Sequence, residues 1–215
     1  MVRPLLLALS LLAASATAHA QDADNAGGDR FIIPRDALSP LRRTPGASAP
    51  AIRATPVERV PEVLRDPSAL SDAARRTRER ILAAARAGNI EALRPLLGEG
   101  DRATQLAFDA LATDPIEFLL AASGDPEGHE LLAILIEVLE TGFIRVDNED
   151  EGVLFVWPYF AGYPIDALKP EMKVELFRLL TGGDYEEMTE FGAYIFYRVG
   201  ITENGDWRFF LSGDG

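Results

Sequence analysis

Residues Val153–Asp214 read VLFVWPYFAGYPIDALKPEMKVELFRLLTGGDYEEMTEFGAYIFYRVGITENGDWRFFLSGD. This stretch holds both tryptophans and all five tyrosines of the chain. Aromatic side chains bury the largest area per residue. We therefore expect the apolar core to centre here and the preceding elements to pack against it.

The end of this stretch predicts a β-hairpin. Asn204-Gly205 separates two apolar runs, Tyr194–Thr202 and Asp206–Ser212. Asn-Gly between apolar runs is the strongest short-range indication of a hairpin with a two-residue loop. Such a loop pairs Thr202 with Trp207 and Gly200 with Phe209, with the Phe209 ring over the bare glycine backbone.

This register gives the hairpin two apolar faces. One face is expected to carry Tyr197, Val199, Ile201 and Phe210, and the other Phe196, Trp207, Phe209 and Leu211. Because apolar faces need cover from water, we expect helices or loops on both sides of the sheet.

The residues before the hairpin indicate more strands and several helices. Phe143–Val146 and Val153–Trp157 are typical of strands. Asp125-Pro126 predicts the start of a helix that is apolar on most sides and therefore buried, running to about Thr141. Other helices are expected over residues 71–87, 90–97, 115–124, 170–180 and 184–191, while 104–112 is ambiguous. The fold class is α+β: an antiparallel sheet of about four strands with N-terminal helices packed on it.

The chain divides into three parts. Residues 1–20 combine Arg3, an apolar run and Ala18-His19-Ala20, which is the pattern of a cleaved signal peptide. Residues 21–70 form a Pro- and Arg-rich stretch, which we expect to be a disordered linker. Residues 71–215 form a single α+β domain. We therefore predict a periplasmic protein with no integral membrane segment in the mature chain.

Charge and cysteine content exclude several functions. The net charge is −13, and residues 101–215 hold 23 acidic against 7 basic residues. An acidic body disfavours nucleic acid and anionic membranes as partners. It favours plain solubility, a cationic partner, or docking of the Arg-rich N-terminal half of the chain on the acidic half. There is no cysteine, so thiol chemistry and cysteine-based metal sites are excluded.

Three segments of the domain carry a family resemblance. They are WPYFAGYPIDAL from Trp157, TGGDYEEM from Thr181 and FGAYIFYRVGITENGDWRFFLSGD from Phe191. Over roughly residues 73–214 the chain resembles a family of uncharacterised exported proteins of Gram-negative bacteria. The resemblance implies export and one compact domain, and it implies no activity and no functional residues.

Catalytic patterns are weak. His129 is the one histidine outside residues 1–20, and it lies in a helix start. Paired carboxylates for glycan hydrolysis have four candidates, Asp184, Glu186, Glu187 and Glu190. Helix capping and the helix dipole explain acidic residues at this place equally well.

The acidic turn between the two expected strands has part of a calcium-binding pattern. Asp147, Glu149, Glu151 and Gly152 match the first positions of an EF-hand loop. The required bidentate glutamate is replaced by Pro158, so the motif fails. We expect no metal site and no cofactor.

The most suggestive candidates for ligand binding are aromatic. Trp157, Tyr159, Phe160 and Tyr163 lie in one loop interrupted by proline and glycine. Such rings either stack on a sugar or peptide or close the end of the core. The leading hypothesis is a periplasmic binding or accessory module without catalysis, acting on an envelope protein, peptide or glycan. The alternative is a carboxylate-based hydrolase of envelope glycan.

Overall fold

The computed structural model describes residues 60–148 and 152–213. The expected signal peptide, most of the expected linker, and Glu149 and Glu151 of the acidic turn lie outside the described residues.

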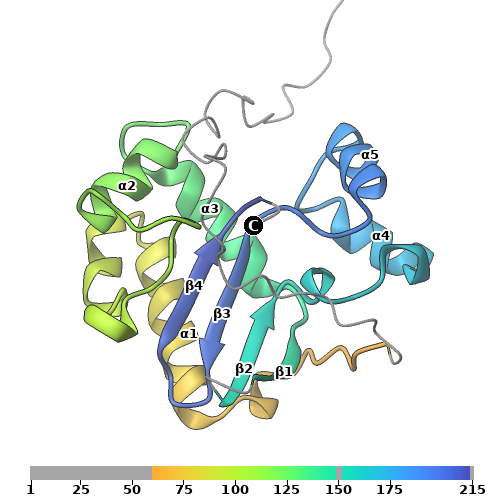
Figure 1. The fold of residues 1–215 in the computed structure, drawn as a ribbon, viewed down its shortest axis with the longest axis horizontal. Coiled ribbons are helices and arrows are strands. Elements are labelled where there is room, and N and C mark those ends of the chain that lie inside the picture. Colours follow the sequence, from red (N-terminus) through yellow and green to blue (C-terminus); the bar gives the residue numbers. More distant parts are fainter. Residues whose placement is uncertain (1–59, 149–151, 214–215) are drawn as a thin grey trace, which may run out of the picture. The chain divides into compact units, whose positions relative to one another are not determined.

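The centre of the described chain is a four-stranded antiparallel sheet (Figure 1). Its strands are β1 (Ile144–Asn148), β2 (Gly152–Trp157), β3 (Arg198–Thr202) and β4 (Trp207–Leu211), adjacent in the order β1-β2-β3-β4. The predicted α+β class with four antiparallel strands is confirmed. Both predicted strand pairs are present, so the short apolar runs and the Asn-Gly turn were sufficient to locate them.

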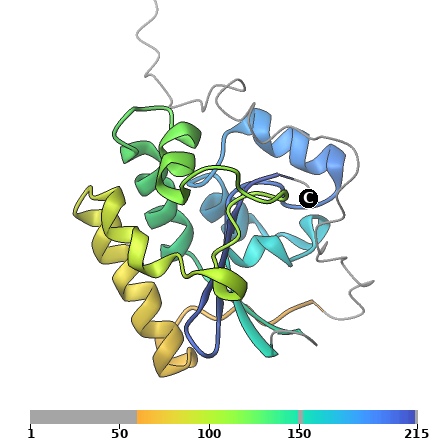
Figure 2. The same cartoon turned by 60° about the vertical axis from the view of Figure 1, so that its left-hand side comes forward.

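One face of the sheet packs on the helices of the first half. These are α1 (Asp72–Arg86), α2 (Pro115–Ala122) and α3 (His129–Glu140), with short 3₁₀ helices at Pro67–Ala69, Ile90–Leu96 and Gly100–Arg102. In Figures 1 and 2 α1, α2 and α3 gather on the same side of the strands. The strand residues buried among them include Phe155, Trp157, Val199 and Ile201. The prediction that α3 is buried is confirmed, since Leu135 and Leu139 are almost fully covered.

The opposite face is covered by the segment between β2 and β3. It contains 3₁₀ turns at Tyr159–Ala161 and Ile165–Ala167, then α4 (Pro170–Leu176) and α5 (Gly182–Phe191). Figure 1 shows α4 and α5 across the sheet from α1 and α3. The alternate strand residues Leu154, Val156, Phe209 and Leu211 are buried here. Helices therefore cover both faces, as the two-sided hairpin pattern predicts.

The hairpin differs from the prediction at its turn. Thr202 N–H donates to the Asp206 carbonyl, so the loop has three residues, Glu203–Gly205, rather than two. Gly205 has φ +89°, the left-handed conformation that such a loop requires. The predicted pairing of Thr202 with Trp207 is therefore wrong.

A β-bulge then restores the predicted register. Ile201 pairs with Trp207, and Gly200 already pairs with Phe209, so Arg208 is the extra residue. The bulge turns Trp207 to the α1–α3 face, where its ring lies 6.2 Å from that of Phe210. The prediction that Trp207 shares the face of Phe209 is therefore wrong. An inserted residue reverses the alternation of side chains along the strand.

Two helix starts also differ. The helix expected over residues 184–191 begins two residues earlier as α5, because Thr181 is its N-cap and forms a capping box with Asp184. The helix predicted from Asp125-Pro126 begins at His129. Asp125 nevertheless caps it, because its carboxylate accepts the backbone N–H groups of His129 and Glu130.

Packed structure begins earlier than residue 71. Leu64 forms an isolated antiparallel bridge with Phe143, next to β1. Leu70 is buried in the core. Leu64 and Leu70, which the sequence assigns to the linker, are therefore packed against the rest of the described chain. The ambiguous segment 104–112 is neither helix nor regular strand, although Gln105 bridges to β4.

Candidate functional site

The aromatic loop predicted as a ligand site lies largely in the core. Trp157 and Tyr159 are fully buried, Phe160 is 2 % exposed and Tyr163 is half-buried. The Tyr159 and Phe160 ring centroids are 4.0 Å apart. The first three rings therefore close the end of the core and offer no open stacking surface to a ligand.

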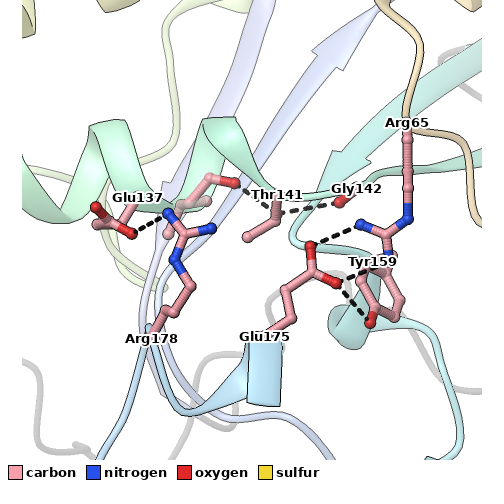
Figure 3. A network of polar contacts seen from close by, with 8 residues as sticks. Arg65, Glu137, Thr141, Gly142, Tyr159, Glu175 and Arg178 are labelled. Atoms are coloured by element: carbon pink, nitrogen blue, oxygen red, sulfur yellow. Dashed lines mark hydrogen bonds and ion pairs between the residues drawn. The ribbon is translucent and has the colours of Figure 1, made fainter. Parts of the chain in front are cut away.

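Next to this loop lies a polar cluster that sequence reasoning missed (Figure 3). The guanidinium of Arg65 makes two hydrogen bonds of 2.8 Å to the carboxylate of Glu175 on α4. The hydroxyl of Tyr159 donates to the same carboxylate over 3.0 Å. The cluster ties the N-terminal end of the described chain to α4.

Partial burial and close partners set the charge states in this cluster. Burial opposes ionisation of Glu175, but hydrogen bonds and charge from Arg65, with further donors, lower its pKa below the ordinary value. Burial, and then the neighbouring Glu175 charge, raise the pKa of Tyr159. Tyr159 therefore stays a neutral donor and Glu175 a charged acceptor, a stable pairing with no proton poised for transfer.

A second ion pair holds the other end of α4. Arg178, just after the helix, contacts the carboxylate of Glu137 on α3 at 3.0 Å (Figure 3). Leu176 lies between these contacts and is fully buried. The inner side of α4 is therefore anchored to two other parts of the described chain, which leaves its outer side facing solvent.

The four carboxylates considered for hydrolysis all come from α5. Asp184 is engaged in the capping box, where its carboxylate accepts the N–H of Thr181. Glu186, Glu187 and Glu190 are on the same short helix, and Glu186 and Glu190 are exposed. A glycosidase needs carboxyl groups that face each other across the bond to be broken. Residues on one helix do not provide that arrangement.

Within residues 60–148 and 152–213, one group of side chains has the spacing of metal ligands: Asp125, Glu127 and His129. Asp125 is already occupied. It accepts three backbone N–H groups, from Glu127, His129 and Glu130, and one hydroxyl, from Ser123. Backbone hydrogen bonds, that of Glu130 above all, lower the pKa of Asp125. The group is explained as a helix cap, with His129 exposed beside it.

Exposed large apolar side chains gather on the outer side of α4 and α5. Among the described residues, such side chains are Val60, Val174, Phe177 and Phe191. Val174 is on α4, Phe177 is its C-cap residue and Phe191 ends α5. Val174 is 72 % exposed and Phe177 46 %. The Phe177 ring lies 5.4 Å from that of Tyr185 on α5. We call Val174, Phe177 and Tyr185 the α4–α5 patch.

Comparisons with known proteins do not assign the chain to a family. No protein-family model matches it, and no curated protein or solved structure shows significant similarity. Among the described residues, no helix combines the length and apolar character needed to cross a bilayer. The resemblance to exported proteins stays a prediction.

Proposed function

We propose that this protein is an exported, non-catalytic binding or accessory module of the cell envelope, and that it contacts its partner through the α4–α5 patch. The observation that carries the proposal is the exposure of Val174 and Phe177 beside Tyr185 on one helix pair. Single exposed apolar residues are ordinary, whereas a group of them marks interaction surfaces.

The placement of the candidate carboxylates bears on the alternative of a glycan hydrolase. Asp184 is engaged as a helix cap, and Glu175 is held by Arg65 and Tyr159. Glu186 and Glu190 belong to the same helix and are exposed. These carboxylates have structural or solvated positions, which gives no support to the alternative of a glycan hydrolase.

The test compares partner capture by the full chain and by two variants. Val174→Asp with Phe177→Asp places charge on the patch, and Val60→Asp is the control at another exposed valine. Photo-crosslinking in envelope extract should give a defined adduct with the parent and the control, and lose it with the double variant. Equal capture by all three proteins refutes the proposal, as does release of soluble fragments from purified envelope glycan.

A further inference from the structure

Three exposed glutamates are on the two helices that carry the α4–α5 patch, and we call these three residues the acidic border. Glu171 lies one helical turn before Val174, and Glu186 and Glu190 are on α5 with Tyr185. All three glutamates are exposed, and among the described residues no ion pair involves them. The two helices therefore combine exposed apolar side chains with an excess of acidic side chains.

Three basic residues lie on or next to α4: Lys169, Lys173 and Arg178. Lys173 and Arg178 are already engaged, whereas Lys169, the N-cap residue, is exposed. The Lys173 ammonium lies 5.7 Å from the centroid of the Tyr185 ring. Arg178 pairs with Glu137 on α3. Residues 169–191 hold six acidic and three basic side chains, so the helix pair keeps an excess of negative charge that a cationic partner complements.

Charge also distinguishes between the possible binding partners of the α4–α5 patch. A second copy of this chain would bring the same acidic border and a net charge of −13 against it, which is repulsive. An anionic membrane surface is repelled for the same reason. A segment with apolar residues on one side and Lys or Arg on the other matches both features of the surface.

We infer that the α4–α5 patch binds a short basic amphipathic segment of a partner protein. Its apolar side chains pack on Val174 and Phe177, and its Lys or Arg side chains lie near Glu171, Glu186 and Glu190. The inference rests on the proposed function and specifies the chemistry of the partner. The anchoring of α4 through Glu175 and Arg178 holds the patch in place before binding, which lowers the ordering cost.

The experiment uses two synthetic helical peptides as probes. The first carries leucine on one side and lysine on the other, and the second has glutamate in place of every lysine. Both are titrated into the ¹⁵N-labelled full chain and followed by chemical-shift changes at two salt concentrations. We expect the basic peptide to shift resonances over residues 171–191, more weakly at high salt, and the acidic peptide to bind at least about tenfold less tightly.

Matched variants separate apolar contact from general charge attraction. Phe177→Ser should weaken binding of the basic peptide by about tenfold, since a central aromatic residue often dominates such contacts. Glu186→Lys with Glu190→Lys should weaken binding and reduce its salt dependence. Glu99→Lys with Asp101→Lys changes the net charge equally at exposed sites elsewhere and should have little effect. Thermal midpoints within error of the parent confirm that the variants fold.

Several outcomes overturn the inference. The first two are chemical-shift changes confined to residues outside α4 and α5, and equal affinity for both peptides. The others are an equal loss of peptide affinity in the two double-lysine variants, and patch-dependent binding to vesicles of anionic phospholipid. Failure of the basic peptide while envelope capture stays dependent on Val174 and Phe177 refutes this inference alone. If partner capture in envelope extract does not depend on Val174 and Phe177, the proposed function itself is refuted.

Discussion

Two tryptophans on the same face of the sheet differ in one hydrogen bond. Trp157 and Trp207 are both buried against the α1–α3 layer. The indole N–H of Trp207 donates to the Phe209 carbonyl over 3.0 Å. Among the described residues, the N–H of Trp157 is buried without a hydrogen-bond partner. An unmade hydrogen bond of a buried group is costly, so the two side chains contribute differently to stability.

Phenylalanine at each position isolates this difference. Both Trp→Phe changes remove similar volume, but Trp207→Phe also leaves the Phe209 carbonyl without that donor, whereas Trp157→Phe removes an unpaired donor. We expect Trp207→Phe to lower the free energy of unfolding by about 1 kcal/mol more than Trp157→Phe. Urea unfolding followed by circular dichroism measures both values. The reverse order would show that packing volume, not hydrogen bonding, separates the two sites.

Gly205 shows how one residue controls the hairpin. Its φ of +89° is strained for a residue with a side chain, and an added Cβ would lie 3.0 Å from the Ala73 carbonyl oxygen of α1. We expect Gly205→Val to cost at least about 2 kcal/mol in unfolding free energy. Gly182→Ala is the control, because Gly182 begins a helix and has open space around it. Equal thermal midpoints for the two variants would show that the left-handed turn does not limit stability.

At the scale of elements, α3 connects the first-half helices to the sheet. Leu135 lies in its middle and is 1 % exposed. Leu135→Ala should lower the free energy of unfolding by about 2–5 kcal/mol, because it loses buried area and leaves a cavity. Chemical unfolding measures the change. Ala133→Ser, at an exposed position of the same helix, should change stability by less than about 0.5 kcal/mol.

The cluster on α4 predicts a pH effect. The pKa of Glu175 is lowered in the folded state, so its pairing with Arg65 stabilises the fold above the unfolded pKa near 4.5 and is lost as pH falls through the folded value. Glu175→Gln should cost about 1 kcal/mol at pH 7, a modest value because Arg65 is half exposed. The cost should disappear at low pH, where the parent is also protonated. Glu171→Gln, exposed on the same helix, is the control.

Thermal unfolding between acidic and neutral pH measures this effect. A stability difference between parent and Glu175→Gln that is constant with pH would mean that the charge of Glu175 does not contribute. A variant more stable than the parent at neutral pH, with this advantage lost toward acid, would mean that the folded state raises the pKa of Glu175 instead of lowering it.

At the scale of the whole described chain, β4 contributes to both cores. Phe210 and Trp207 belong to the α1–α3 side, while Phe209 and Leu211 belong to the α4–α5 side. Gln105 also hydrogen-bonds to β4 through its backbone, as acceptor from Phe210 N–H and as donor to the Arg208 carbonyl. The last strand is therefore shared by elements from all parts of the described sequence.

Deletion of residues 206–215 should therefore prevent stable folding rather than weaken it locally. We expect an aggregated or proteolysed product, because two cores lose buried area and β3 becomes an open edge. Expression level, size-exclusion profile and thermal unfolding measure this. A soluble monomer that unfolds cooperatively near the parent's midpoint would contradict the importance of β4.

Local patterns of the chain were sufficient for much of the fold. Asp114-Pro115 correctly predicted α2, whose first N–H groups bond to the Asp114 carboxylate. Short apolar runs predicted the strands, and the predicted pairing of Gly200 with Phe209 was correct. These features depend on neighbours in the sequence, so residue type and spacing reveal them.

Features that join distant segments were not predictable in the same way. Arg65 and Glu175 are 110 positions apart, and neither has an unusual local context. The bulge at Arg208 changes the side of Trp207, and the aromatic loop is buried because α4 and the residues around Arg65 pack against it. The α4–α5 patch is exposed because the ion pairs of Glu175 and Arg178 turn the other side of α4 toward the rest of the chain. Composition and periodicity carry the local preferences, whereas the meeting of remote side chains depends on the free energy of the whole packed chain.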